Sequence, residues 1–130
     1  MFLAEAVAVT GGRVITIDVS ADKQRHAHAK LAAVDFCIGD AREIITSLLG
    51  PFDFGLINLW KDLYIPCFDL VISKLADAAF LAADNILFPE FTRNDMVAYQ
   101  RHVRAKRGIE SILLPVGSGI ELSRFAPRGL

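Results

Sequence analysis

The chain alternates short apolar runs with segments of helical character, and this alternation limits the folds that it can adopt. Four of the runs are predicted strands, at residues 13–18, 34–38, 52–57 and 78–83. Helices are expected between and after them, at about 20–32, 41–49, 62–75 and 94–107. Strands joined through helices pair in parallel, because a parallel connection needs a long crossover. The sequence therefore predicts an α/β fold with a mostly parallel sheet.

The two ends of the chain differ from this pattern. An apolar helix is expected over residues 2–9, and a Gly-Gly pair ends it. Near the C-terminus, β-rich runs at 109–114 and 119–125 flank a turn that contains proline and glycine, which is typical of an antiparallel hairpin. The 130 residues suffice for one hydrophobic core. We expect a single domain over residues 1–130.

Composition and charge exclude several classes of function. The formal net charge of -1 gives no basic surplus for nucleic acid, and no apolar run approaches the roughly 20 residues that span a bilayer. No secretory signal is evident. Cys37 and Cys67 lack metal-ligand spacing, so we expect free thiols in a reducing cytoplasm. The 53% hydrophobic content fits a sheet buried on both faces, or a face that another chain covers, such as a second copy in a homodimer.

Polar side chains follow two of the predicted strands. Asp84 and Asn85 close one strand, while Asn58 follows the preceding strand, with Lys61 three residues later. Open α/β sheets bind ligands at the carboxyl ends of their strands. If the two strand ends are neighbours, Asn58, Asp84 and Asn85 offer hard oxygen ligands to a magnesium-type cation. The structural alternative is that Asp84 and Asn85 cap a loop and that Lys61 is a solvated side chain before a helix.

Five short segments carry a resemblance to a known family. They lie at residues 14–18, 39–41, 58–64, 83–85 and 114–119. In this order they resemble the cation-dependent O-methyltransferases, the catechol and caffeoyl-CoA O-methyltransferase group of the S-adenosylmethionine-dependent superfamily. The resemblance covers nearly the whole chain. It implies a Rossmann-like class I methyltransferase sheet.

The resemblance implies that S-adenosylmethionine is the methyl donor. Asp18 would hold the ribose hydroxyls, since a carboxylate accepts two hydrogen bonds. Asp40 would contact the adenine amino group with Ala41 beside it, and Trp60 would flank the cofactor or the acceptor ring. The structural alternative for Asp18 and Asp40 is helix entry, where aspartate is favoured. For Trp60 the alternative is packing.

The resemblance also makes Asp84 and Asn85 two of three metal ligands, Asn58 the third and Lys61 the general base. These roles suit methyl transfer, an in-line displacement in which an oxygen nucleophile attacks the methyl group of a sulfonium. A divalent cation such as Mg²⁺ positions the acceptor hydroxyl and lowers its pKa. A lysine beside such a cation has a depressed pKa and accepts a proton near neutrality.

Departures from the family pattern have consequences. Asn58 stands where the family has an aspartate, so the protein ligands carry one negative charge instead of two, and weaker magnesium binding is expected. The Gly-rich turn between the first strand and first helix is not found, and the chain is expected to begin inside that helix. The link before residue 34 is shorter than the family usually has. The final hairpin is expected to offer no acid to an acceptor hydroxyl.

The leading hypothesis is an S-adenosylmethionine-dependent O-methyltransferase that methylates a small hydroxylated aromatic acceptor with the help of a divalent cation. The alternative is a non-catalytic remnant of this fold that pairs with another chain. A nucleotide-binding module of another kind is a third interpretation. The remaining titratable residues of note are interpreted as solvated helix surface: His26, His28, His102 and the basic run at 101–107.

Overall fold

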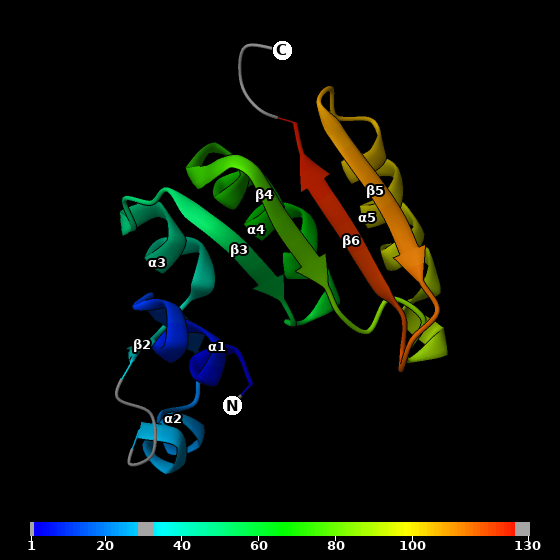
Figure 1. Ribbon diagram of the computed structural model, residues 1–130. Coiled ribbons are helices and arrows are strands. Elements are labelled where there is room, and N and C mark those ends of the chain that lie inside the picture. The colour runs from blue at the N-terminus through cyan, green and yellow to red at the C-terminus, as the bar shows by residue number, and fades with distance from the viewer. Residues whose placement is uncertain (1, 29–32, 127–130) are drawn as a thin grey trace. The chain divides into compact units, whose positions relative to one another are not determined.

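The computed structural model describes residues 2–28 and 33–126 (Figure 1). The chain divides into two compact units, residues 1–48 and 49–130, each with its own helices and strands. The elements alternate in the predicted order, so the α/β class is confirmed. None of the described helices is long and apolar enough to cross a membrane.

The first unit contains a two-stranded parallel sheet and three helices. They are α1 (Phe2–Thr10), β1 (Val14–Asp18), α2 (Ala21–His28), β2 (Val34–Ile38) and α3 (Ala41–Ser47). The two strands run in register, from the pair Val14 and Val34 to the pair Asp18 and Ile38. Both strands therefore end at the same edge of the sheet. The last four residues of the helix predicted at 20–32 lie outside the described residues.

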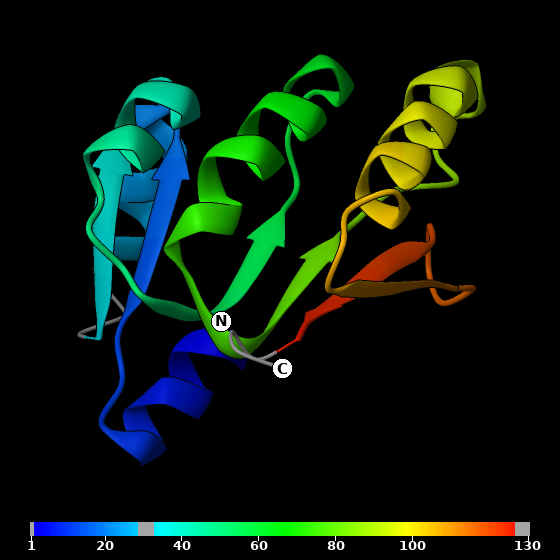
Figure 2. The ribbon, with the colours of Figure 1, turned by 90° about the horizontal axis from the view of Figure 1, so that it is seen from above.

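The second unit contains a four-stranded sheet in the order β3-β4-β6-β5. Its elements are β3 (Phe52–Ile57), η1 (Lys61–Leu63), α4 (Tyr64–Val71), η2 (Ile72–Lys74), β4 (Leu75–Ala83), η3 (Glu90–Thr92), α5 (Arg93–Arg104), β5 (Ile109–Leu114) and β6 (Ile120–Phe125), where η marks a short 3-10 turn. β3 and β4 are parallel, whereas β6 is antiparallel to both β4 and β5. The predicted C-terminal hairpin is therefore confirmed. Figure 2 shows α4 and α5 on the same side of this sheet.

The core of the second unit lies between its sheet and these two helices. Tyr64 and Phe68 come from α4, while Met96, Tyr99 and Val103 come from α5, and all five are fully buried. Residues three or four apart lie on one face of a helix, so each helix turns an apolar stripe toward the sheet. The ring of Tyr99 meets the rings of Tyr64 and Phe68 edge-on, at centroid distances of 5.5 and 5.9 Å. This packing fixes Tyr64 at the start of α4.

The segment between β3 and β4 departs from the prediction. The helix expected at 62–75 is broken into η1, α4 and η2, and β4 begins at Leu75 instead of residue 78. Alanine favours helices and is depleted in strands, so the Ala-rich sequence of β4 hides the start of the strand. Pairing with β3 and β6 and the burial of Ala79 and Leu81 override that preference. α5 also ends earlier than predicted, at Arg104.

Candidate active site

The carboxyl ends of β3 and β4 lie side by side, as the sequence predicts. Ile57 pairs with Ala83 in the parallel ladder, and the amide of Asp84 donates to the carbonyl oxygen of Ile57 at 2.9 Å. One residue later, the side-chain amide of Asn85 donates to Oδ1 of Asn58 at 3.0 Å. The strand ends thus bring Asn58 into contact with the Asp-Asn pair. The role of these three residues as metal ligands stays a prediction.

The backbone of Asn85 adopts a left-handed conformation, with φ of 57°. Asparagine tolerates this conformation better than most residues that carry a side chain. The amide of Asn85 also donates to Oδ1 of Asp84 at 2.8 Å, which closes a tight turn after β4. The Asp-Asn pair therefore has a conformational reason to follow the strand, and this reason is independent of any bound cation.

Lys61 reaches from η1 to this turn. Its Nζ donates to the carbonyl oxygen of Asn85 and to the hydroxyl of Tyr64, the latter at 3.3 Å. The Tyr64 hydroxyl donates to the carbonyl oxygen of Asp84 at 2.7 Å. Burial lowers the pKa of Lys61, and the charge of Asp84 opposes this only in part. Lys61 is therefore a partly buried amine with two hydrogen-bond partners and not a fully solvated side chain, while its role as general base stays a prediction.

A pocket of about 480 Å³ lies beside Lys61 and Asn85, both of which form part of its wall. Three aromatic residues also line it, and all are largely exposed to solvent: Trp60 (81%), Phe88 (62%) and Phe91 (89%). The volume is typical of pockets that bind small molecules, and exposed aromatic faces suit a planar ring. Trp60 thus lines a pocket and does not pack into the core.

The oxygen atoms at the strand ends are of the type that Mg²⁺ prefers, but they carry little charge. The described residues include no group of three or more His, Cys, Asp or Glu side chains that could hold a metal ion. The predicted set consists of one carboxylate, from Asp84, and two amides, from Asn58 and Asn85. A half-turn of the Asn85 amide exchanges its nitrogen for its oxygen, so both amides are able to present oxygen atoms. The three side chains therefore offer the oxygen ligands that a hard cation prefers, but together they carry only one negative charge.

The two acids predicted to bind S-adenosylmethionine lie in the first unit. Oδ1 of Asp18 accepts from the amide of Ser20 at 2.8 Å. Asp40 caps α3, because its Oδ1 accepts from the amide of Arg42 at 2.8 Å and its carboxylate pairs with the Arg42 guanidinium at 2.6 Å. The Arg42 side chain, and then its amide, lower the pKa of Asp40 to about 2. These contacts agree with helix entry, while cofactor contacts of Asp18, Asp40 and Ala41 stay predictions.

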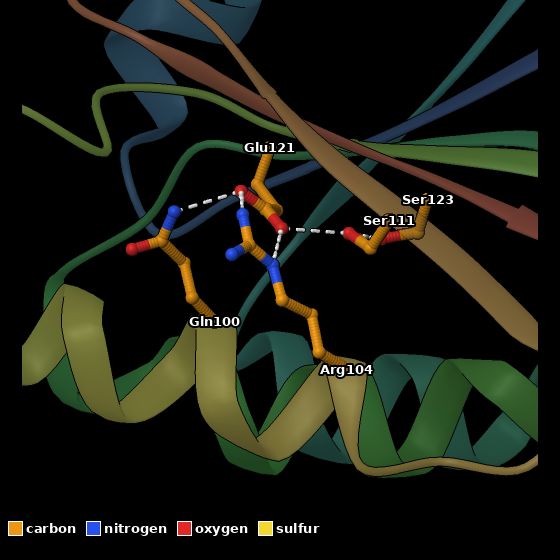
Figure 3. A network of polar contacts seen from close by, with 5 residues as sticks. All are labelled: Gln100, Arg104, Ser111, Glu121 and Ser123. Carbon is orange, nitrogen blue, oxygen red and sulfur yellow. Dashed lines mark hydrogen bonds and ion pairs between the residues drawn. The ribbon is translucent and has the colours of Figure 1, made fainter.

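A buried polar cluster between α5 and the C-terminal hairpin is absent from the sequence predictions (Figure 3). The carboxylate of Glu121 is fully buried and accepts from Nε and Nη2 of Arg104 at 2.7 and 3.0 Å. Gln100 and Ser111 each donate to it at 2.8 Å, and Ser111 also contacts Ser123. The hairpin therefore does contain an acid, and its contacts tie it to α5 and β5. The sequence carries no signal for it, because Glu121 and Ser123 alternate with apolar neighbours in β6, a pattern that predicts exposed polar side chains where the structure buries them.

The basic run at 101–107 is only partly the solvated face that the sequence suggested. Arg104 is exposed over 46% of its side chain, as that interpretation expects, but its guanidinium also pairs with the buried carboxylate of Glu121. His102 is on the surface of α5, where its Nε2 lies 2.7 Å from Oδ1 of Asp69. The side chains of two further histidines lie outside the described part of the chain: His26 and His28.

Comparison with solved structures supports the predicted fold. An O-methyltransferase from Bacillus cereus in complex with SAH matches with a TM-score of 0.75 and 19% identity over 88% of this chain and 63% of that chain. The O-methyltransferase TomG from Streptomyces achromogenes, in complex with SAM, matches with a TM-score of 0.72 and 18% identity over 88% and 62%. The SAH-bound methyltransferase PaMTH1 from Podospora anserina matches with a TM-score of 0.74 and 16% identity over 87% and 60%. No protein-family profile matches the sequence.

These matches establish the fold at low sequence identity. The chain has the Rossmann-like fold of these methyltransferase structures, with the C-terminal antiparallel hairpin that the sequence predicted. It spans between 60% and 63% of the length of the three structures.

Proposed function

We propose that this chain belongs to an S-adenosylmethionine-dependent O-methyltransferase that methylates a small hydroxylated aromatic acceptor with the help of a divalent cation. The observation that carries the proposal is the pocket, where Lys61 and Asn85 stand beside three exposed aromatic rings. The pocket adjoins the carboxyl ends of two parallel strands, where open α/β sheets bind ligands. The fold shared with SAM- and SAH-bound O-methyltransferases supports the choice of methyl donor.

S-adenosylmethionine supplies a methyl group on a sulfonium, and the chain's residues hold and deprotonate the acceptor. The aromatic rings of the pocket wall bind a planar acceptor. A neutral lysine amine has two N–H groups and one lone pair. The contacts of Lys61 with Asn85 and Tyr64 use the two N–H groups, which leaves the lone pair for the acceptor's hydroxyl proton. The acceptor oxygen then bonds to the methyl carbon while the carbon–sulfur bond breaks.

Asn58, Asp84 and Asn85 would hold the divalent cation, which polarises the acceptor hydroxyl. The contact between Asn58 and Asn85 supports this set, because it brings two of the three side chains within hydrogen-bond distance before any cation binds. The single carboxylate makes weak binding the expected behaviour.

The variant Asn58→Asp is expected to bind Mg²⁺ about tenfold more tightly than the wild-type chain. One added charge about 4 Å from a divalent cation contributes roughly 2 to 8 kcal/mol before the cost of removing water from both groups, and a net gain of about 1.4 kcal/mol is tenfold in affinity. Calorimetric titration with magnesium chloride measures the change. Asn94→Asp is the matched control, because it adds the same charge at an exposed position that does not line the pocket. Equal affinities for wild type and Asn58→Asp would remove Asn58 from the ligand set.

Calorimetric titration with S-adenosylmethionine, with and without Mg²⁺, tests the proposed function. We expect binding in the micromolar to millimolar range that covers most enzyme substrates. Asp18→Asn is expected to weaken it, since the variant loses a carboxylate that would accept two ribose hydroxyls. Asp53→Asn, which changes an exposed strand residue, is the control. A wild-type chain that binds no S-adenosylmethionine at millimolar concentration would contradict the proposal.

The second candidate function is a non-catalytic module that pairs with another copy of the chain. It is favoured by exposed apolar side chains on the sheet of the second unit, where Phe54, Leu56, Phe80 and Ile112 are between 41% and 57% exposed. Side chains alternate between the faces of a strand, so these four lie on the face away from α4 and α5. A chain that binds no S-adenosylmethionine, yet forms a concentration-dependent dimer in sedimentation, would favour this candidate.

A further inference from the structure

Tyr64 joins the two turns that follow β3 and β4. It is the first residue of α4 and is fully buried. Its hydroxyl donates to the carbonyl oxygen of Asp84 at 2.7 Å and accepts from Nζ of Lys61 at 3.3 Å. Nζ also lies 4.7 Å from the centroid of the Tyr64 ring, within the range of a cation–π contact. One phenol therefore touches both the amine of the first turn and the backbone of the second.

We propose that Tyr64 is a positioning residue, which holds the amine of Lys61 at the pocket wall and fixes the Asp84–Asn85 turn beside it. The inference rests on the proposed function, because the position of the Lys61 amine matters only if Lys61 accepts the acceptor's proton. Tyr64 itself does not line the pocket. It acts through Lys61 and through the carbonyl oxygen of Asp84.

The backbone explains why a hydroxyl is needed at this place. The left-handed conformation of Asn85 brings two successive carbonyl groups, those of Asp84 and Asn85, into reach of Tyr64 and Lys61. Both residues are partly buried, so a carbonyl group that loses its donor there is only incompletely compensated by water, and the turn depends on these donors. A phenylalanine would fill the same space in the core but would supply no donor to Asp84 and no acceptor to Lys61.

Tyr99 provides the internal comparison. It is as deeply buried as Tyr64 and packs against it, but its hydroxyl has no hydrogen-bond partner among the described residues. Replacing Tyr99 by phenylalanine removes the same atom from the same core and leaves the two turns untouched. The pair Tyr64→Phe and Tyr99→Phe therefore separates the contacts of one hydroxyl from the general effect of removing a buried oxygen.

The experiment compares the full-length wild-type chain, Tyr64→Phe and Tyr99→Phe by NMR at one fixed pH, with ¹³C and ¹⁵N only in lysine. The Lys61 signal is assigned by its loss in Lys61→Arg. In Tyr64→Phe the Lys61 side-chain signals are expected to shift toward those of the exposed Lys23, whereas in Tyr99→Phe they stay at the wild-type position. A folded Tyr64→Phe with wild-type Lys61 signals overturns the proposal. So does a shift of equal size in both variants.

A reciprocal measurement covers the case in which Tyr64→Phe does not fold. With ¹³C at the ζ carbon of tyrosine, Lys61→Met is expected to shift the Tyr64 signal and to leave the Tyr99 signal in place. An unmoved Tyr64 signal overturns the proposal. Neither measurement uses S-adenosylmethionine, a metal or an acceptor. A chain that fails to bind S-adenosylmethionine therefore counts against the proposed function alone, while unmoved signals count against the positioning role alone.

Discussion

Replacing Arg104 by methionine lowers the free energy of unfolding by about 3 kcal/mol at neutral pH, measured by urea denaturation. The change leaves the carboxylate of Glu121 fully buried without its cation. Breaking a buried ion pair from one side costs about 3–5 kcal/mol. We expect the lower end of that range, because Gln100 and Ser111 still donate to Glu121 and because the Arg104 side chain is itself 46% exposed.

The matched control is Arg101→Met, which removes an exposed arginine one turn earlier on α5. Substitutions of this kind usually change stability by less than about 0.5 kcal/mol. The double variant Arg104→Met with Glu121→Gln is expected to recover part of the loss, since it removes the buried charge. Equal stabilities of Arg104→Met and Arg101→Met would contradict the structural role of the cluster.

The loss should also depend on pH. Burial alone raises the pKa of Glu121, but the hydrogen bonds from Arg104, Gln100 and Ser111 outweigh it and leave the pKa below its ordinary value. A depressed pKa in the folded state contributes stability above the unfolded pKa, and this contribution is lost as the pH falls through the folded value. Without Arg104, burial favours the protonated acid. The gap between wild type and Arg104→Met should therefore narrow in acid.

Replacing Lys61 by methionine is expected to reduce methyl transfer by about 100- to 10,000-fold, the usual contribution of a general acid or base. The methionine fills similar space but has no lone pair on nitrogen to accept a proton. The assay follows transfer of labelled methyl from S-adenosylmethionine to catechol, used as a probe acceptor, in the presence of Mg²⁺. Affinity for S-adenosylmethionine should stay close to that of the wild type, because the predicted ribose and adenine contacts come from other residues.

Lys23→Met, which removes an exposed lysine on α2, is the matched control for loss of a positive charge. Lys61→Arg adds a second comparison: arginine keeps the charge but does not give up its proton, so it should be as inactive as methionine. Activity of Lys61→Met within about threefold of wild type would exclude Lys61 as the base.

The sequence predicted those parts of the fold that depend on local pattern. β1, β2 and β3 are rich in β-branched and aromatic residues, and the structure has them within one residue of the predicted bounds. The start of β4 was hidden, because its alanines favour a helix until strand pairing and burial select small residues. The break of the predicted helix at 62–75 was hidden for a related reason. Short 3-10 turns depend on how the chain enters and leaves the core, and the spacing of apolar residues in the sequence does not predict this.

Some contacts of the candidate site could also be predicted from the sequence, and others could not. The approach of Asn58 to Asn85 was predictable, because parallel strands that are neighbours end at one edge. The link from Lys61 to Tyr64 and the Asp84 carbonyl was not. It depends on the left-handed turn at Asn85 and on the depth at which α4 starts. The cofactor roles came from resemblance to a family, and the metal roles from the polar strand ends together with that resemblance; both stay predictions.

The described wall of the pocket comes from two segments outside the sheet, one at residues 59–62 that runs into η1 and one within 85–95 that runs through η3 into the first turn of α5. Neither segment contributes to the ladder of the sheet. Loops on a rigid scaffold tolerate substitution better than the elements that they connect. Exchange of Trp60, Phe88 or Phe91 for other side chains should therefore redirect which molecules this scaffold accepts while the strands beneath keep their pairing, so selectivity is open to evolution and to engineering at little structural risk.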